Sequence, residues 1–275
     1  MLSFNEDMVF LLYGTCGGFG CVLVLLWLYL MNHPSPKNKQ YQSAYLGDKA
    51  NQNIWTKEKI DDQTTNVKSQ IFTNDPIRYT YHPDVGNENF NFLAQMDLTG
   101  KSVLVIGSER PWLEVIALAS GAANVTTLEY GAIISQHPQI KTMTPDIFRQ
   151  SYLDNSLSFF DAVLSFSSLE HSGLGRYGDA LNPWGDILSL ARAHCVTKDD
   201  GQLMLGLPSG EDTIEWNLHQ QYGDIRWPLV TINWIPIDEV ADFDKGRPNC
   251  GGQQHLFRKV PSRSSSNTNN INTNK

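Results

Sequence analysis

Short apolar runs and helical apolar spacing alternate between residues 101 and 130. Val103–Ile106 is a β-branched run that ends at Gly107, and Val125–Leu128 is a second run that ends on Glu129. Between the two runs, apolar residues recur at helical spacing: Leu113, Val115, Ile116 and Leu118. This pattern predicts a strand, a helix and a second strand that closes on a carboxylate.

The same alternation continues toward the C-terminus. Further strands are expected at Ile140–Met143, Phe159–Phe166, Gln202–Leu207, Trp227–Ile237 and Gln253–Val260. Helices are expected at Trp184–Cys195 and Thr213–Tyr222. The second is placed to form a lid or a wall for an acceptor, or else to pack Trp216 and Leu218 on the core with His219 exposed. This order predicts a three-layer α/β domain with a Rossmann-like, mostly parallel sheet and one antiparallel strand near the C-terminus. Ligands of such sheets bind at the carboxyl ends of the strands.

Residues 8–31 contain no charged side chain and are rich in Leu, Val, Phe and Gly. At about 1.5 Å per helical residue, they can cross a hydrocarbon core of about 30 Å. We interpret the segment as a single transmembrane helix, with a cleavable signal peptide or a buried core helix as alternatives. Gly14 and Gly18 are spaced as in helices that pair into a homodimer, although glycine is also common in membrane helices.

Charges beside this segment favour a cytosolic location for the C-terminal domain, because Lys37 and Lys39 follow it and its N-terminal flank is acidic. Asn124–Thr126 is a glycosylation sequon that only a lumenal domain would use. Its place at the start of a predicted core strand makes chance occurrence the better interpretation. The expected organisation is an N-terminal tail (1–7), a transmembrane helix (8–31), a polar stalk (32–67), an α/β domain (68–260) and a disordered tail (261–275).

The composition excludes several classes of function. A net charge of −8 and a pI near 5.3 argue against a nucleic-acid-binding protein, which would carry a basic face. Cys195 and Cys250 are the only cysteines outside the predicted span, so no disulfide framework is expected. The absence of a Cys-x-x-Cys motif or a Cys/His cluster in the sequence leaves no metal site to predict.

Four segments resemble a class I S-adenosylmethionine-dependent methyltransferase over residues 101–260. They are Val103–Gly107, Gly121–Glu129, Phe160–His171 and Leu190–Leu207. More narrowly, the chain resembles an uncharacterised, nematode-described family of unknown function in Gly107-Ser108, Pro111–Glu114, Leu128–Tyr130, Glu170–Asp179 and His219–Gly223. The first resemblance implies a methyltransferase fold and S-adenosylmethionine as cofactor. The second names no reaction.

The resemblance implies a cofactor site formed by Gly107, Ser108, Glu129, Tyr130 and Ser165. Glu129 would accept hydrogen bonds from the ribose hydroxyls, a role that acids at strand ends have in nucleotide-binding folds. The simpler alternative for Glu129 is a solvated acid at the start of a loop. Gly107 allows a sharp turn and a close approach of the backbone to a ligand, which an ordinary turn glycine would equally explain.

The loop after the first strand departs from the methyltransferase pattern. The family carries glycines at alternate positions, where this chain has Glu109 and Pro111, and Val105 replaces the usual acid before the first glycine. Glu109 would place a negative charge near the carboxylate of the cofactor, and Arg110 could pair with that carboxylate instead. Pro111 suits the first turn of a helix. These changes leave the fold intact and act on cofactor binding.

The loop over residues 165–186 carries most of the polar chemistry, at the edge of the sheet where a substrate meets a cofactor. His171 is a candidate general base, oriented by Glu170 or Asp179, and Arg176 lies on the acceptor side. Methyl transfer also proceeds by positioning alone. In the alternative interpretation, the loop is a capped turn in which Asp179 binds backbone groups and Arg176 pairs locally.

The sequence therefore predicts a membrane-anchored S-adenosylmethionine-dependent methyltransferase whose acceptor is a small molecule or a glycan. The alternative is a catalytically inactive methyltransferase-like module that binds or scaffolds at a membrane. The altered turn at Glu109 and Pro111 favours the inactive module, and the polar loop over residues 165–186 favours the enzyme.

Overall fold

The computed structural model describes residues 53–72, 78–79, 88–89, 96–237 and 253–261. A seven-stranded sheet in the order β12-β13-β9-β8-β4-β5-β7 forms its centre. The strands are β4 (Ser102–Ile106), β5 (Asn124–Leu128), β7 (Ile140–Met143), β8 (Phe160–Phe166), β9 (Thr197–Leu207), β12 (Trp234–Pro236) and β13 (Gln253–Lys259). The five strands from β7 to β9 are parallel, and β13 pairs antiparallel with β9 and β12. The predicted α/β class with a mostly parallel sheet is confirmed.

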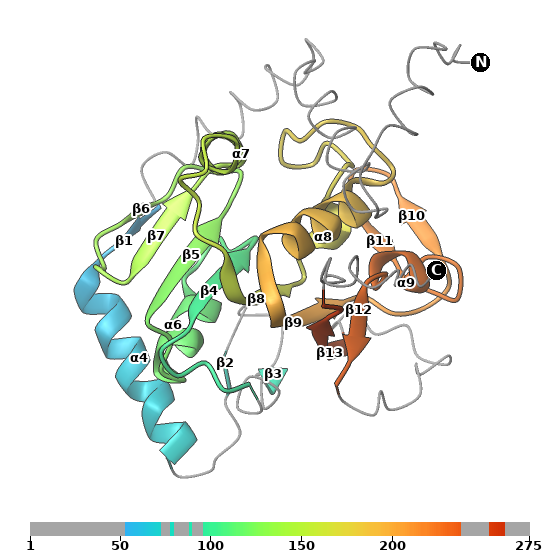
Figure 1. Cartoon of the computed structure of the whole chain (residues 1–275). Coiled ribbons are helices and arrows are strands. Elements are labelled where there is room, and N and C mark those ends of the chain that lie inside the picture. The colour runs from blue at the N-terminus through green and yellow to red at the C-terminus, as the bar shows by residue number, and fades with distance from the viewer. Residues whose placement is uncertain (1–52, 73–77, 80–87, 90–95, 238–252, 262–275) are drawn as a thin grey trace, which may run out of the picture.

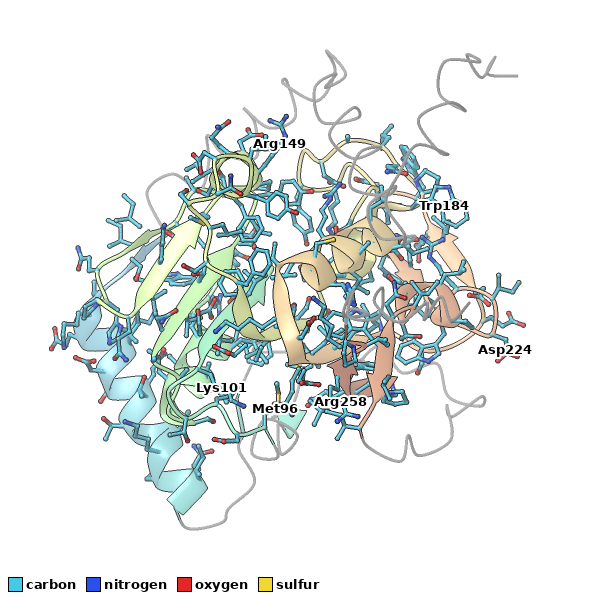
Figure 2. All side chains as sticks on the ribbon, in the orientation of Figure 1. Met96, Lys101, Arg149, Trp184, Asp224 and Arg258 are labelled. Carbon is cyan, nitrogen blue, oxygen red and sulfur yellow. The ribbon has the colours of Figure 1, made fainter. Side chains whose placement is uncertain are left out.

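Helices cover both faces of this sheet (Figure 1). On one face lie α4 (Lys57–Phe72) and α6 (Trp112–Ala119), and on the other lie α7 (Pro145–Leu153), α8 (Gly185–Val196) and α9 (Trp227–Val230). Successive residues of a strand point to opposite faces. Val103 and Val105 of β4 therefore join the core under α6, whereas Leu104 and Ile106 join the core under α8. Side chains fill the space between the helices and the sheet, which gives three layers (Figure 2).

Among the described residues, three two-stranded ladders lie outside the central sheet. They are β1 (Ile54–Trp55) with β6 (Ile134–Ser135), β2 (Arg78–Tyr79) with β3 (Glu88–Asn89), and β10 (Thr213–Glu215) with β11 (His219–Gln221). A single 3-10 turn, η1 (Leu169–His171), follows β8. The β10–β11 hairpin lies beside η1 and so forms part of the surroundings of the strand ends.

The prediction of a polar stalk up to residue 67 is wrong for residues 54–67, which belong to the folded domain. Ile60, Val67 and Ile71 recur on one side of α4, and all three pack into the core that α6 also joins. Spacings of seven and four residues keep these side chains on one helical stripe. The many polar residues between them obscured the stripe in the sequence.

The helix expected over Thr213–Tyr222 is also wrong, because this segment forms the β10–β11 hairpin. Asn217 lies in its turn with φ +57, a left-handed conformation that asparagine tolerates better than most residues. The strand expected over Trp227–Ile237 is confirmed only at Trp234–Pro236. Its first part is the short helix α9, in whose first turn a proline stands.

The predicted transmembrane helix (8–31), the N-terminal tail (1–7) and the first part of the stalk lie outside the described residues, as do residues 262–275 of the C-terminal tail. Within the ranges that the structure describes, no helix combines the length and the apolar character needed to cross a bilayer.

Candidate functional site

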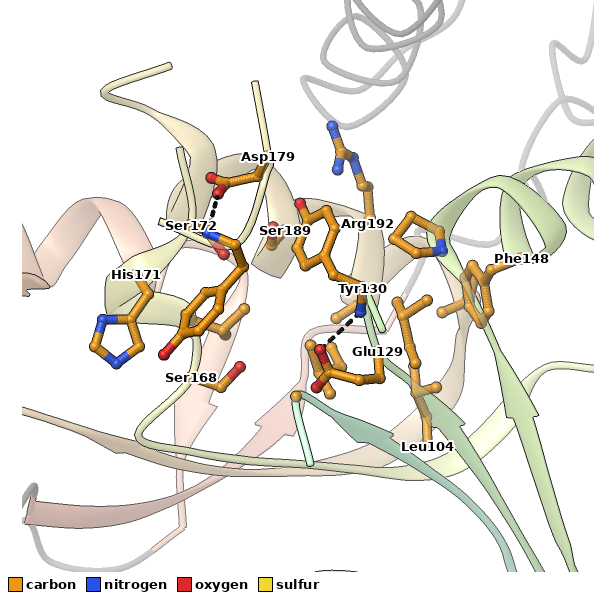
Figure 3. Close-up of a pocket in the computed structure, with 18 of the residues that line it drawn as sticks. Leu104, Glu129, Tyr130, Phe148, Ser168, His171, Ser172, Asp179, Ser189 and Arg192 are labelled. Carbon is orange, nitrogen blue, oxygen red and sulfur yellow. Dashed lines mark hydrogen bonds between the residues drawn. The ribbon is translucent and has the colours of Figure 1, made fainter. Parts of the chain in front are cut away.

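A cavity opens where the carboxyl ends of β4, β5 and β8 meet (Figure 3). Across the sheet, β7, β5, β4, β8 and β9 are the third, second, first, fourth and fifth parallel strands of the chain. Connections therefore leave β4 in opposite directions, and this reversal is where doubly wound sheets bind ligands. The cavity is lined by the loops after these strands and by one face each of α7 and α8. The predicted location of the site at the carboxyl edge agrees with this geometry.

Glu129 follows β5, and its carboxylate faces the cavity (Figure 3). Its Oε2 accepts a hydrogen bond from the Ser108 backbone N–H at 3.0 Å, and its Oε1 accepts one from the Tyr130 N–H at 2.8 Å. Burial raises the pKa of the Glu129 carboxyl, and the backbone donors offset this only in part. A carboxylate has about four lone-pair sites. The backbone contacts therefore fix its orientation and leave capacity for a ligand.

Gly107 admits a neighbouring loop to the end of β4. It adopts φ +73, and a Cβ at this position would lie 1.6 Å from Ser168 Oγ and 2.4 Å from Ser168 Cβ. No other residue fits here without displacing Ser168. The close approach that the sequence predicted at this glycine is therefore made by a side chain of the protein, and Ser168 itself lines the cavity next to Gly107.

The remaining predicted cofactor residues lie at different depths. Tyr130 lines the cavity and stands between Glu129 and Arg192 (Figure 3). Burial raises the pKa of the Tyr130 hydroxyl, which therefore stays neutral. Ser165 lies below the cavity, where its hydroxyl donates to the Ile106 carbonyl at 3.2 Å. Ser165 is thus part of the sheet rather than of the cavity lining, and residues 167 and 168 line the cavity instead.

Asp179 organises the loop after β8. Its side chain is buried and accepts hydrogen bonds from the backbone N–H groups of Gly173 and Tyr177. Arg176 is exposed, lies 5.7 Å from the ring of Tyr177 and is not part of the cavity lining. Asp179 and Arg176 thus make the local contacts that the capped-turn interpretation predicts. Tyr177 and Asp179 also line the cavity.

His171 lies on the side of the cavity opposite Phe148 (Figure 3). Its Nδ1 bonds to the backbone carbonyl of Leu218 in the β10–β11 hairpin. Since a carbonyl only accepts, we assign the proton to Nδ1, which leaves Nε2 as the basic nitrogen. Nε2 lies 3.8 Å from Glu170 Oε1. Burial lowers the pKa of His171, so the imidazole is neutral near pH 7.

Sequence analysis missed the cavity residues that come from helices. Phe148 and Tyr152 of α7 form one wall, and Arg192 of α8 contributes to the facing wall. Arg192 is the one lysine or arginine among the described residues that line the cavity. Burial lowers its pKa to about 10, so the guanidinium remains charged at neutral pH. Helical spacing in α8 indicates an inward face, but only the packing of α8 on the sheet brings Arg192 to the cavity.

In the ranges that the structure describes, no group of three His, Cys, Asp or Glu side chains is close enough to hold a metal ion.

The solved structures that match this chain share little sequence with it. A candidate hemolysin from Streptococcus thermophilus is 14% identical, with a TM-score of 0.43 over 62% of this chain and 63% of its own. The Burkholderia thailandensis 1,6-didemethyltoxoflavin-N1-methyltransferase, solved with S-adenosylhomocysteine, is 13% identical, with a TM-score of 0.42 over 73% and 78%. The N-methyltransferase NodS from Bradyrhizobium japonicum is 12% identical, with a TM-score of 0.41 over 62% and 94%. The chain spans less than two thirds of the hemolysin.

No curated protein matches the chain. A family model described as "Caenorhabditis protein of unknown function, DUF268" matches residues 100–249. This stretch is more than half of the 275 residues, and it runs from β4 past β12. The nematode-described family that the sequence resembles is thereby confirmed, and the chain belongs to this Caenorhabditis family of unknown function.

Proposed function

We propose that this domain is an S-adenosylmethionine-dependent methyltransferase. Glu129 carries the proposal, because it is an acid at the carboxyl end of the second parallel strand and faces the cavity where the sheet order reverses. Nucleotide-binding α/β folds place an acid near this position to hold ribose hydroxyls. The backbone donors Ser108 and Tyr130 orient the Glu129 carboxylate before any ligand arrives.

The residues around Glu129 fit the other part of a nucleoside. Leu128, Tyr130 and Phe148 line the cavity and supply apolar and aromatic surface, which suits a planar base. When bound, the cofactor supplies an activated methyl group. The chain itself orients the cofactor through Glu129, excludes water with the walls of α7 and α8, and holds an acceptor at the strand ends.

The acceptor side of the cavity is the loop after β8. Asp179 shapes this loop by holding Gly173 and Tyr177. In our proposal, His171 uses Nε2 to accept a proton from the acceptor, and Arg176, which does not line the cavity, has no part in the reaction. These groups favour a small-molecule acceptor with an ionisable hydroxyl or amine.

Calorimetric titration of the full-length chain with S-adenosylmethionine and S-adenosylhomocysteine tests this proposal. We expect binding, and we expect Glu129→Ala to remove most of it. Glu215→Ala, which changes an exposed acid of β10, is the matched control. If titration of the folded chain with millimolar ligand releases no heat, the methyltransferase proposal is wrong. The catalytically inactive membrane module is then the better interpretation. An unchanged affinity in Glu129→Ala would mean that the cofactor binds elsewhere.

We also propose that residues 8–31 anchor the domain in a membrane with its C-terminal part in the cytosol. The uncharged length of this segment and the lysines after it support the proposal. Extraction of the chain from membranes by alkaline carbonate would contradict an anchor. Protection of the C-terminal domain from a protease added on the cytosolic side would contradict the orientation. Pairing of two anchors through Gly14 and Gly18 stays a prediction.

A further inference from the structure

Glu114 is a fully buried acid in α6 that lies directly behind the first loop of the site. Its side chain is 0% exposed and is not part of the cavity lining. Thr127 Oγ1 lies 2.7 Å from Glu114 Oε1, and Ser108 Oγ lies 2.9 Å from Glu114 Oε2. The acid therefore joins α6 to β5 and to the loop after β4. The protonation state of this buried carboxyl group follows from the hydrogen bonds that its two hydroxyl partners make.

The hydrogen bonds of the Ser108 hydroxyl indicate whether Glu114 is protonated. Ser108 Oγ lies 2.6 Å from the Arg110 carbonyl oxygen as well as 2.9 Å from Glu114 Oε2. Each of these oxygen pairs is at hydrogen-bond distance and needs one proton between its atoms. A serine hydroxyl has one proton, and a carbonyl oxygen has none. Ser108 donates to Arg110, so the proton between Ser108 and Glu114 belongs to Glu114.

Burial acts in the same direction as this proton count. Loss of solvent, the largest cause, and the negative charge of Glu129 together raise the pKa of Glu114 to about 7, although the hydrogen bond from the Thr127 hydroxyl acts in the opposite direction. A buried acid that donates a hydrogen bond in its neutral form avoids the cost of an isolated buried charge. With this pKa, the Glu114 carboxyl can gain or lose its proton at physiological pH.

The same serine connects Glu114 to the cofactor site. The backbone N–H of Ser108 donates to Glu129 Oε2 at 3.0 Å, and its side chain is the one held by Glu114. This loop lacks the alternate glycines of the methyltransferase pattern and instead carries Glu109 and Pro111. We propose that Glu114 is a neutral acid that positions Ser108, and through the Ser108 N–H orients the Glu129 carboxylate toward the ligand. The ligand named here rests on the proposed function, whereas the protonation of Glu114 does not.

Three forms of the full-length chain test this role: wild type, Glu114→Gln and Glu114→Ala. The glutamine amide donates to Ser108 and accepts from Thr127 at every pH, so it copies the neutral acid. Alanine removes both hydrogen bonds. S-adenosylhomocysteine affinity is measured by calorimetry at pH 6 and pH 8. With a pKa of about 7, roughly a tenth of wild type keeps the Glu114 proton at pH 8, so its affinity should fall about tenfold.

In Glu114→Gln, the affinity for S-adenosylhomocysteine should not show the fall that Glu114 causes in wild type between pH 6 and pH 8. Glu114→Ala should bind S-adenosylhomocysteine weakly at both pH values. Wild type and Glu114→Gln share every other titrating group, so the difference between their pH profiles isolates Glu114. Identical profiles in these two proteins would overturn the positioning role. Loss of binding by folded Glu114→Gln at pH 6 would also overturn it, because the amide preserves both hydrogen bonds.

An infrared titration separates this inference from the proposed function. Wild type should show the carbonyl band of a protonated carboxylic acid at pH 6, and part of that band should be missing in Glu114→Gln. If S-adenosylhomocysteine does not bind to wild type but the band difference is present, the proposed ligand fails and the neutral Glu114 stands. If the band is unchanged in Glu114→Gln, Glu114 is ionised and the inference fails, whatever binds.

Discussion

Replacing Glu170 with glutamine should remove a loss of stability that wild type suffers as the pH rises. Glu170 lies in η1 with 1% of its surface exposed, and its Oε1 accepts a hydrogen bond from Ser167 Oγ at 2.8 Å. Its Oε2 has no hydrogen-bond partner within the part of the chain that the structure describes. Burial raises the pKa of Glu170 from its ordinary value of 4.5 to about 7, and the Ser167 hydroxyl only partly opposes this.

The size of the change in stability follows from the difference between the pKa of Glu170 in the folded chain and its pKa in the unfolded chain. The folded chain keeps the Glu170 proton at pH values where the unfolded chain has released it. This contribution to stability is therefore complete below about pH 4.5 and is lost as the pH rises through about 7. At about 1.4 kcal/mol per pKa unit, the rise from 4.5 to about 7 corresponds to a loss of at most ~3.5 kcal/mol. Glu114 has a similar pKa and should contribute a similar loss over the same range.

Urea unfolding of the full-length chain between pH 5 and pH 8 measures this effect. Relative to Glu170→Gln, wild type should lose ~2.5 kcal/mol more stability across this range, because the other titrating groups, among them Glu114, Glu129 and His194, contribute alike to both proteins. Glu58→Gln, which changes an exposed acid in α4, is the control and should follow wild type. Parallel curves for wild type and Glu170→Gln would refute the reasoning, because they would mean that Glu170 is ionised in the fold at all these pH values.

Two further predictions concern packing and are measured by the same urea unfolding. Gly107→Ala should lower the free energy of unfolding by more than ~2 kcal/mol, because the added Cβ would overlap Ser168 and the φ of residue 107 is positive. Adding Ser168→Gly to Gly107→Ala should restore part of this stability. If no stability is restored, the overlap with Ser168 is not the cause of the loss. Asp186→Ala should cost about 3–5 kcal/mol, because it removes the partner of buried Arg226 at 3.0 and 2.7 Å. Trp184→Ala is the comparison, because the Trp184 ring is 53% exposed and lies 5.6 Å from the Arg226 guanidinium. It should cost far less, and equal losses would contradict a buried ion pair.

Local pattern sufficed for the strands and helices that bury a continuous apolar face. Val103–Ile106, Phe159–Phe166 and Gln202–Leu207 were recognisable because fully buried parallel strands have almost no polar positions. The pattern failed where the apolar signal was diluted. The stripe of Ile60, Val67 and Ile71 in α4 is separated by polar residues, and Thr213–Tyr222 has a composition compatible with both helix and hairpin.

The sequence by itself determined the alternation of strands and helices, the parallel sheet and the acid at the end of its second strand, because these depend on neighbours within one element. The tertiary structure alone decided which side chains share the cavity. It brought Arg192 and Phe148 to the site from two helices, left Arg176 outside, and filled the space at Gly107 with Ser168. Such contacts join residues far apart in the chain, and local periodicity does not contain the packing of helices on a sheet.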